Sequence, residues 1–191
     1  GDVRSQSVRS KYQNLSWTIC ALHNLAVAVQ QLHRAEISHN DIKPSNLLVF
    51  DEYLQKLADL GRATSNSRGG PWDEYPYTGD IQYSAPEFWY GNVQFPTNFG
   101  KITFNVRRAS DLELLGSMGY FFVTGEPLTP ILLTTLRPEH NPQNWTGTFD
   151  DVLPYLRDGY GQAFKYFEER LPRSEDGKIW REASELEISI R

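Results

Sequence analysis

Eight consecutive residues decide the fold of this chain, and they read His39-Asn40-Asp41-Ile42-Lys43-Pro44-Ser45-Asn46. The stretch places a carboxylic acid, an ammonium group and an amide in one short loop, and Pro44 restricts the backbone of that loop. Such a loop suits phosphoryl transfer, which needs a positioned acceptor hydroxyl, bound metal ions and a positive charge beside the transferred group. Asp41 is the candidate to orient the hydroxyl, and Lys43 is the candidate for the positive charge.

Two candidate ligands for a metal ion follow in the sequence. Asn46 lies five residues after Asp41, and Asp59 lies thirteen residues after Asn46. Amide and carboxylate oxygens are the hard ligands that Mg²⁺ prefers. Each short signal alone also fits an ordinary loop salt bridge or a turn, so the order and spacing of the motifs carry the argument.

Composition limits the class of protein. The chain has 191 residues, of which 39% are apolar and 13% aromatic, enough for one globular domain with a buried core. A net charge of −5 argues against a nucleic-acid or anionic-membrane surface. The single cysteine, Cys20, excludes an internal disulfide, and no apolar run is long enough to span a bilayer. We therefore expect a soluble, intracellular protein, with the cytoplasm as its location.

Apolar spacing predicts the elements around the motif. Residues 1–15 are polar and read as a linker. From Ser16, apolar residues recur at intervals of three and four, which predicts an amphipathic helix with Ser16 as its N-cap and an end near His33-Arg34. Residues 47–50 and 55–58 are two short apolar runs around a turn, which predicts a β-hairpin.

The second half of the chain reads as helical. Residues 109–124 are apolar on nearly all sides, which predicts a central, buried helix. Asp111 near its start would then need a partner, because an isolated buried charge is costly. Residues 126–191 read as two or three amphipathic helices separated by proline-containing turns.

The order of these motifs resembles the C-terminal lobe of eukaryotic-type protein kinases, over nearly the whole chain. Residues 39–46 are similar to the family's catalytic loop, His-Arg-Asp-x-Lys-Pro-x-Asn. Residues 59–61 are similar to its Asp-Phe-Gly, and residues 85–87 match its Ala-Pro-Glu. The resemblance implies a mainly α fold with a small β-hairpin, as a kinase-like C-lobe over residues 16–191. It also implies an activation segment over 59–87 and a central helix over 109–124.

The resemblance implies a role for each motif residue. Asp41 is similar to the catalytic aspartate, and Lys43-Pro44 after it is the pattern of serine/threonine rather than tyrosine kinases. The implied cofactors are ATP and Mg²⁺, and the implied partner is a protein substrate. The metal ligands would be Asn46 and Asp59. The side chains around the cofactor would be Lys43, Asn46, Leu48 and Asp59, with Leu48 under the adenine ring.

Three further positions match structural residues of the family. Asp111 matches the buried helix aspartate that holds the catalytic-loop backbone. His39 and Leu60 match members of a stacked hydrophobic column. Glu87 corresponds to a glutamate that pairs with a late arginine. Two candidates for that arginine remain open, Arg170 and Arg173.

Two departures concern the activation segment. Asn40 replaces the arginine that usually pairs with a phosphorylated loop, and an amide cannot supply that charge. Activation by loop phosphorylation is therefore not the leading expectation. Asp80 stands where many members carry a threonine, and it can bond Lys43 while adding a like charge near Asp41. The loop hydroxyls that remain candidate phosphorylation sites are Thr64, Ser65, Ser67 and Thr78.

The residues before Ser16 contain no glycine-rich cover and no strand lysine of the kind that kinases use above ATP. We therefore expect the N-terminal lobe upstream or in trans, and little activity from the isolated chain. Gly1 would fit an N-myristoylation pattern if a methionine had been removed, but for a motif this short we favour a fragment or a trimmed chain as the explanation. Two alternatives stay open: a pseudokinase scaffold without catalysis, and a small-molecule kinase of the aminoglycoside or choline phosphotransferase type.

Overall fold

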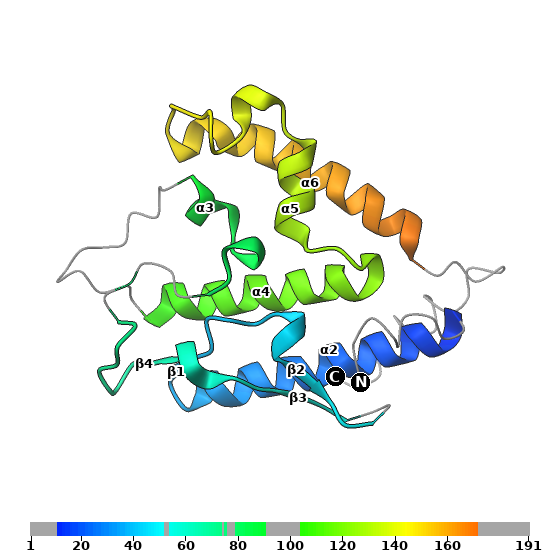
Figure 1. Cartoon of the computed structure of the whole chain (residues 1–191), viewed down its shortest axis with the longest axis vertical. Coiled ribbons are helices and arrows are strands. Elements are labelled where there is room, and N and C mark those ends of the chain that lie inside the picture. The colour runs from blue at the N-terminus through cyan, green and yellow to red at the C-terminus, as the bar shows by residue number, and fades with distance from the viewer. Residues whose placement is uncertain (1–10, 52–53, 74, 76–78, 91–103, 172–191) are drawn as a thin grey trace, which may run out of the picture.

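Helix α4 (Phe104–Thr124) runs through the middle of the molecule, as Figure 1 shows. Helix α2 (Lys11–Arg34) packs on one side of it, and helix α6 (Phe149–Arg170) packs on the other. Helix α5 (Leu128–Thr135) links the two levels by packing on both α4 and α6. The computed structural model describes residues 11–51, 54–73, 75, 79–90 and 104–171, with the backbone alone for residues 11–15.

Helix α2 begins earlier than its apolar pattern indicates. It starts at Lys11, so the prediction that Ser16 is its N-cap is wrong, and Ser16 is an exposed residue inside the helix. The pattern locates only the stripe that is buried, in which Ala21, Leu25 and Val29 are almost fully covered. The predicted end is confirmed at Arg34, where basic side chains suit the negative end of the helix dipole.

The predicted hairpin is present. Strand β2 (Leu47–Val49) pairs antiparallel with β3 (Gln55–Leu57), with Leu48 opposite Lys56. A second antiparallel pair, β1 (Ile37–Ser38) with β4 (Thr64–Ser65), does not follow from the sequence pattern. Strands of two residues carry too little periodicity to be recognised in a sequence. This second pair joins the chain just before the motif loop to the start of the long polar loop.

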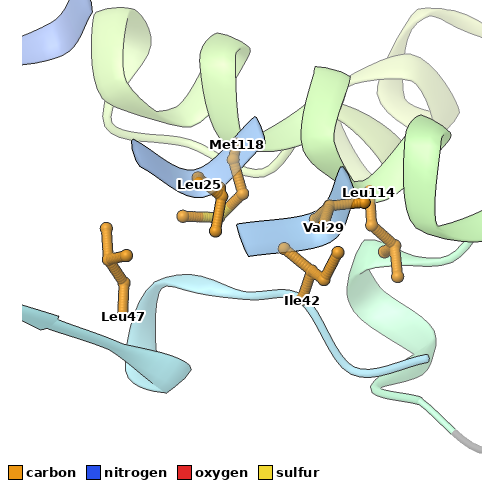
Figure 2. Close-up of a cluster of buried hydrophobic side chains, with 6 residues drawn as sticks. All are labelled: Leu25, Val29, Ile42, Leu47, Leu114 and Met118. Atoms are coloured by element: carbon orange, nitrogen blue, oxygen red, sulfur yellow. The ribbon is translucent and has the colours of Figure 1, made fainter. Parts of the chain in front are cut away.

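A small apolar core lies directly beneath the motif loop. Figure 2 shows Ile42 and Leu47 facing Leu25 and Val29 of α2. Two side chains of α4, Leu114 and Met118, complete the cluster. Ile42 is 1% exposed, and complete burial of such a side chain contributes about 1.5–3 kcal/mol. The apolar residue inside the polar motif therefore anchors the loop to two helices.

Helix α4 is confirmed as the central helix, but it starts at Phe104 rather than residue 109. Its polar members Asp111 and Ser117 are buried together with Leu114 and Met118. The expectation of burial on nearly all sides is too strong, because Leu112 is 58% exposed. Packing against α2, α5, α6 and β1 covers much of the helix and leaves Leu112 at the surface.

The region after α4 contains α5 and α6, in agreement with the predicted helices, and residues 172–191 lie outside the described part. A capping box between Thr148 and Asp151 starts α6. Short 3₁₀ turns supply the remaining regular structure, at Pro44–Asn46, Leu60–Arg62, Ile81–Tyr83 and Pro138–His140, and α3 (Pro86–Trp89) follows the third of them. None of the described helices combines the length and the hydropathy that a bilayer crossing requires.

Candidate active site

Asp111 of α4 holds the backbone of the motif loop. One carboxylate oxygen accepts the N–H of His39 at 2.8 Å, and the other accepts the N–H of Asn40 at 2.7 Å. His33 Nε2 of α2 lies 2.9 Å from the first of these oxygens. Asp111 is fully buried, and these partners compensate the burial of its charge. The partner that the sequence required for this acid is therefore the loop itself.

Asn40 connects the motif loop to the long polar loop. Its φ of 66° lies in the left-handed region, which asparagine tolerates better than most residues do. The side-chain amide donates to the carbonyl of Arg62 at 2.9 Å and to Thr64 Oγ1 at 3.0 Å. Thr64, one of the candidate phosphorylation sites, is thus a buried partner of Asn40, whereas Thr78 lies outside the described residues.

The Asp41 carboxylate is buried and oriented from several directions. Its Oδ1 accepts the backbone N–H of Asp80 at 2.9 Å. Its Oδ2 accepts Nδ2 of Asn46 at 3.0 Å, and Lys43 Nζ lies 3.3 Å from the same oxygen. Asp41 is 4% exposed, so these contacts replace most of its hydration.

Lys43 lies between two carboxylates. Its Nζ is 3.3 Å from Asp41 Oδ2 and 3.4 Å from Asp80 Oδ2. The contact with Asp80 that the sequence suggested is therefore present. Asp80 also accepts the N–H of Gln82 through its other oxygen at 3.1 Å, which fixes the start of the Ile81–Tyr83 turn.

Asn46 and Asp59 are brought near each other by the backbone. Ala58, directly before Asp59, donates its N–H to the carbonyl of Asn46 at 2.8 Å. The Ala58 carbonyl in turn lies 3.0 Å from Nε2 of the buried His39. Asp59 has a φ of 62° and accepts the N–H of Gly61 at 3.1 Å. The backbone hydrogen bond between the two segments therefore holds the two candidate metal ligands, Asn46 and Asp59, near each other.

The chemistry of these donors fits Mg²⁺. Because Asn46 Nδ2 donates to both the carbonyl and the carboxylate of Asp41, its amide oxygen is left to act as a ligand. Within the described residues, no group of three or more His, Cys, Asp or Glu side chains could hold a metal ion. Mg²⁺ commonly takes one or two protein oxygens and completes its shell with phosphate oxygens and water. An amide oxygen and a carboxylate suit that mode of binding.

Several apolar side chains near the site are exposed to solvent. Leu48 and Phe50 of the hairpin are 48% and 61% exposed. Leu60, assigned by resemblance to a stacked column with His39, is 54% exposed while His39 is fully buried. The structure therefore presents an apolar surface beside the polar groups of the motif loop.

Arg107 is a residue that sequence reasoning does not assign. It lies on α4, is 6% exposed, and donates Nη2 to the carbonyls of Trp72 at 2.9 Å and Tyr75 at 3.2 Å. Burial lowers the pKa of its guanidinium, while the negative charges of Asp73 and Asp111 raise it. Trp72 Nε1 donates to the carbonyl of Gly61 at 2.7 Å. Its position one turn before Asp111 could have marked Arg107 as a residue near the site. Nothing in the sequence, however, links it to residues 72–75.

Arg170, one of the two candidate partners of Glu87, does not pair with it. The guanidinium of Arg170 lies 3.3 Å from the ring centroid of Tyr166 and donates to the Tyr166 carbonyl at 3.4 Å. Arg173, the other candidate, lies outside the described residues. Glu87 lies near another acid, Glu113. Burial raises the pKa of Glu113 to about 7, and the negative charge of Glu87 contributes to this rise. Glu113 Oε2 is buried without a hydrogen-bond partner in the described part of the chain.

Comparison with known proteins agrees with these motifs. Residues 10–99 match the family described as the protein kinase domain. A probable cell division protein kinase of Encephalitozoon cuniculi is 30% identical over 112 residues, which cover 57% of this chain and 37% of that protein. The human serine/threonine-protein kinase ULK3 is 36% identical over 108 residues, covering 48% of this chain and 22% of that protein.

A third relative, the serine/threonine-protein kinase SBK1 of Danio rerio, is 38% identical over 68 residues, covering 35% of this chain and 17% of that protein. In each of these three cases the match spans well under half of the relative's length. The matched residues contain the motif loop, residues 59–61 and residues 85–87. Residues 10–99, just under half of the chain, are therefore similar to the protein kinase domain, and two of these relatives are named serine/threonine-protein kinases.

Proposed function

We propose that the natural protein transfers the γ-phosphoryl group of ATP to a serine or threonine hydroxyl of a protein substrate. In this proposal residues 16–191 are the C-terminal lobe of its kinase domain, with the catalytic loop at 39–46 and the activation segment at 59–87. The observation that carries the proposal is the Asp41 carboxylate, which is buried and held by Asp80, Asn46 and Lys43. Its need for ATP places the proposed reaction inside the cell.

The side chains then have distinct tasks. Asp41 accepts a hydrogen bond from the substrate hydroxyl and receives its proton as the oxygen bonds to phosphorus. The bond between the γ-phosphorus and the bridging oxygen breaks, and ADP leaves with that oxygen. The ammonium of Lys43, 3.3 Å from Asp41, supplies positive charge where negative charge develops on the transferred group.

Asn46 and Asp59 would hold Mg²⁺. When bound there, the ion would neutralise charge on the phosphate oxygens. Asn46 has a second task that needs no metal, because its Nδ2 fixes Asp41 through two hydrogen bonds. Replacement of Asn46 is therefore expected to affect both metal binding and the orientation of Asp41.

The exposed apolar surface of the hairpin supports an upstream or separate N-terminal lobe. Leu48, Phe50 and Leu54 are all at least 42% exposed, next to the polar groups of the site. A lobe that covers them would bury apolar area and enclose the adenine of ATP over Leu48. The isolated chain is therefore expected to bind Mg-ATP weakly and to transfer little phosphate.

The test is phosphate transfer by the natural protein that contains this chain, with Asp41→Asn as the variant. Loss of a positioned general base reduces rates by about 10²–10⁴-fold, so we expect transfer to fall at least a hundredfold. Asp158→Asn is the matched control, because Asp158 is an exposed aspartate on α6. Equal activity of the Asp41 variant and the control would refute the assignment.

A non-catalytic scaffold is the second candidate, and one observation favours it. The Asp80 carboxylate lies 3.4 Å from Lys43 and competes with a phosphate for that ammonium. A thermal-shift titration of the natural protein with Mg-ATP separates the two functions. Stabilisation at millimolar ligand supports the enzyme, since a ligand that binds the folded state raises its melting temperature. No shift at that concentration supports the scaffold.

A further inference from the structure

Arg62 is a cation beside the site that neither the motif nor the proposed reaction uses. It follows the Asp-Leu-Gly motif in the Leu60–Arg62 turn. Its Nη1 donates to the carbonyl of Gly79 at 3.0 Å, and its Nε lies 4.0 Å from Asp41 Oδ2. Its own carbonyl accepts the Asn40 amide at 2.9 Å. One residue therefore contacts both the catalytic loop and the far end of the activation segment.

Gly79 is the neighbour of Asp80, whose N–H bonds Asp41 Oδ1 at 2.9 Å. The two oxygens of Asp41 are thus approached from opposite ends of the same segment, by Asp80 at Oδ1 and by Arg62 at Oδ2. The bond from Arg62 to Gly79 joins these two ends directly. If this bond is lost, Gly79 is less firmly held, and the hydrogen bond from the Asp80 N–H to Asp41 is weakened.

The charges around Asp41 also support a role for Arg62. Asp41 and Asp80 are two carboxylates that share the ammonium of Lys43. Arg62 brings a further positive charge to 4.0 Å from Asp41, and it balances the pair. Its side chain is 43% exposed, so solvent screens the charge and the hydrogen bond to Gly79 carries more of the effect.

We propose that Arg62 is a positioning residue for Asp41, and that its bond to Gly79 keeps Arg62 and Asp80 in place at the two oxygens of the catalytic carboxylate. We call this arrangement the Arg62 clasp, and its role in catalysis rests on the proposed function. The clasp consists of the contacts of Arg62 with Gly79, Asp41 and Asn40. It therefore holds Arg62 and Gly79 together beside the catalytic loop.

The clasp is tested first in the 191-residue chain, by hydrogen exchange of the Asp80 amide followed by NMR. Arg62→Gln removes the charge and the guanidinium fork, and we expect exchange to accelerate about tenfold, the effect of losing one such hydrogen bond. Arg62→Lys keeps the charge without the fork, and its exchange rate should be intermediate. Arg68→Gln is the control, because Arg68 is an exposed arginine of the same segment.

Equal Asp80 exchange in the Arg62→Gln and Arg68→Gln variants would overturn the clasp. Circular dichroism identifies any variant that fails to fold. If Arg62→Gln is such a variant, Arg62→Lys decides the question. We then expect exchange at least about threefold faster than in the wild type, and unchanged exchange counts against the clasp.

The positioning role is tested in the natural protein by steady-state phosphate transfer. Arg62→Gln should lower kcat about tenfold and leave KM for ATP within about twofold, because Arg62 acts through the catalytic carboxylate of Asp41. Arg62→Lys should recover part of kcat. An unchanged kcat in an active enzyme overturns the positioning role. Absence of transfer by the wild-type protein refutes the proposed function itself, and the Asp80 exchange then still decides whether the clasp exists.

Discussion

Two buried carboxylates, those of Asp111 and Asp41, determine the geometry of this site. Asp111 fixes the motif loop through two backbone N–H groups, and Asp41 is fixed in turn by groups of the loop and by the N–H of Asp80. Neither acid is stable at its position without those partners, because a buried unpaired charge costs several kcal/mol. The same contacts that satisfy the charges therefore determine the geometry of the loop.

Asp111→Asn should destabilise the chain. An amide presents only one acceptor oxygen, so either the His39 or the Asn40 N–H loses its partner in the variant. We expect a loss of about 2–3 kcal/mol in the free energy of unfolding, measured by urea denaturation. Asp158→Asn, at an exposed position of α6, should change it by less than about 0.5 kcal/mol. Similar stabilities of the two variants would contradict the structural role of Asp111.

Glu113 predicts how stability varies with pH. Burial raises its pKa from 4.5 to about 7, so the folded protein binds the proton more tightly than the unfolded chain. The stabilisation is complete below pH 4.5 and is lost as the pH rises towards 7, by up to about 3 kcal/mol. Glu113→Gln should flatten this part of the stability curve and raise stability above the pKa of Glu113.

Urea denaturation of the wild type and the variant at a series of pH values measures this effect. Glu168→Gln is the control, because Glu168 is an exposed glutamate on α6. A wild-type stability that rises as the pH approaches 7 would contradict the burial of Glu113. So would a Glu113→Gln variant that is less stable than the wild type in mildly alkaline solution.

Asp80 determines how freely Lys43 can reach a phosphate. Asp80→Thr removes the carboxylate that lies 3.4 Å from Lys43 and leaves the backbone N–H that bonds Asp41. We expect kcat of the natural protein to rise a few-fold, because Lys43 then has one carboxylate partner rather than two. A fall in kcat of about tenfold or more would show instead that the Asp80 carboxylate is needed for the reaction.

At the scale of the elements, contacts between helices hold the upper part of the molecule together. Helix α6 approaches α5 closely where Gly159 faces Thr135 and Leu132. A Cβ atom on Gly159 would lie 2.7 Å from Thr135 Oγ1 and 2.8 Å from Leu132 Cδ1, which is too close for unaltered packing. The glycine therefore allows two helices to pack at a distance that a larger residue would prevent.

Gly159→Ala should therefore lower the free energy of unfolding by about 1–3 kcal/mol, the usual cost of overpacking. Gly161→Ala is the control on the same helix, because Gly161 is exposed and a Cβ atom added to it would meet no described atom within 4 Å. The control should gain about 0.5–1 kcal/mol from the better helix propensity of alanine. Thermal or urea unfolding measures both, and a gain in both variants would contradict the close packing of α5 and α6.

The sequence predicts elements where a period repeats, and it fails where contacts join distant segments. The hairpin, the end of α2 and the central helix follow from apolar spacing, whereas β1 and β4 are two residues each and are paired only in the fold. Apolar spacing suggests a start for α2 at Ser16 rather than Lys11, because apolar residues mark a buried face and do not mark where a helix begins.

The same limit applies to the site. The contact between Lys43 and Asp80 can be suggested from the motif order. The contacts of Arg107 with Trp72, and of Arg62 with Gly79, join residues that are far apart in the sequence. No pattern of apolar spacing encodes such contacts. Of the two candidate partners of Glu87, Arg170 contacts the ring of Tyr166 instead, and Arg173 lies outside the described residues.

At the scale of the whole molecule, the chain matches only part of each relative. Its match spans 37% of the length of one relative and 22% of another. The polar groups of the site and the exposed apolar residues of the hairpin lie on neighbouring segments, at the surface where ATP and a second lobe would meet in the proposed kinase. Activity is therefore a property to be measured in the natural protein rather than in the chain alone.

The most direct measurement is phosphoamino acid analysis of a protein substrate incubated with the natural protein and ATP radiolabelled at the γ-phosphate. The proposed function predicts label in phosphoserine or phosphothreonine with the wild type and with Asp158→Asn, and at least about a hundredfold less label with Asp41→Asn. Label that persists in the Asp41 variant, or a wild-type protein that transfers none, would contradict the assignment of Asp41 as the catalytic residue of a serine/threonine kinase.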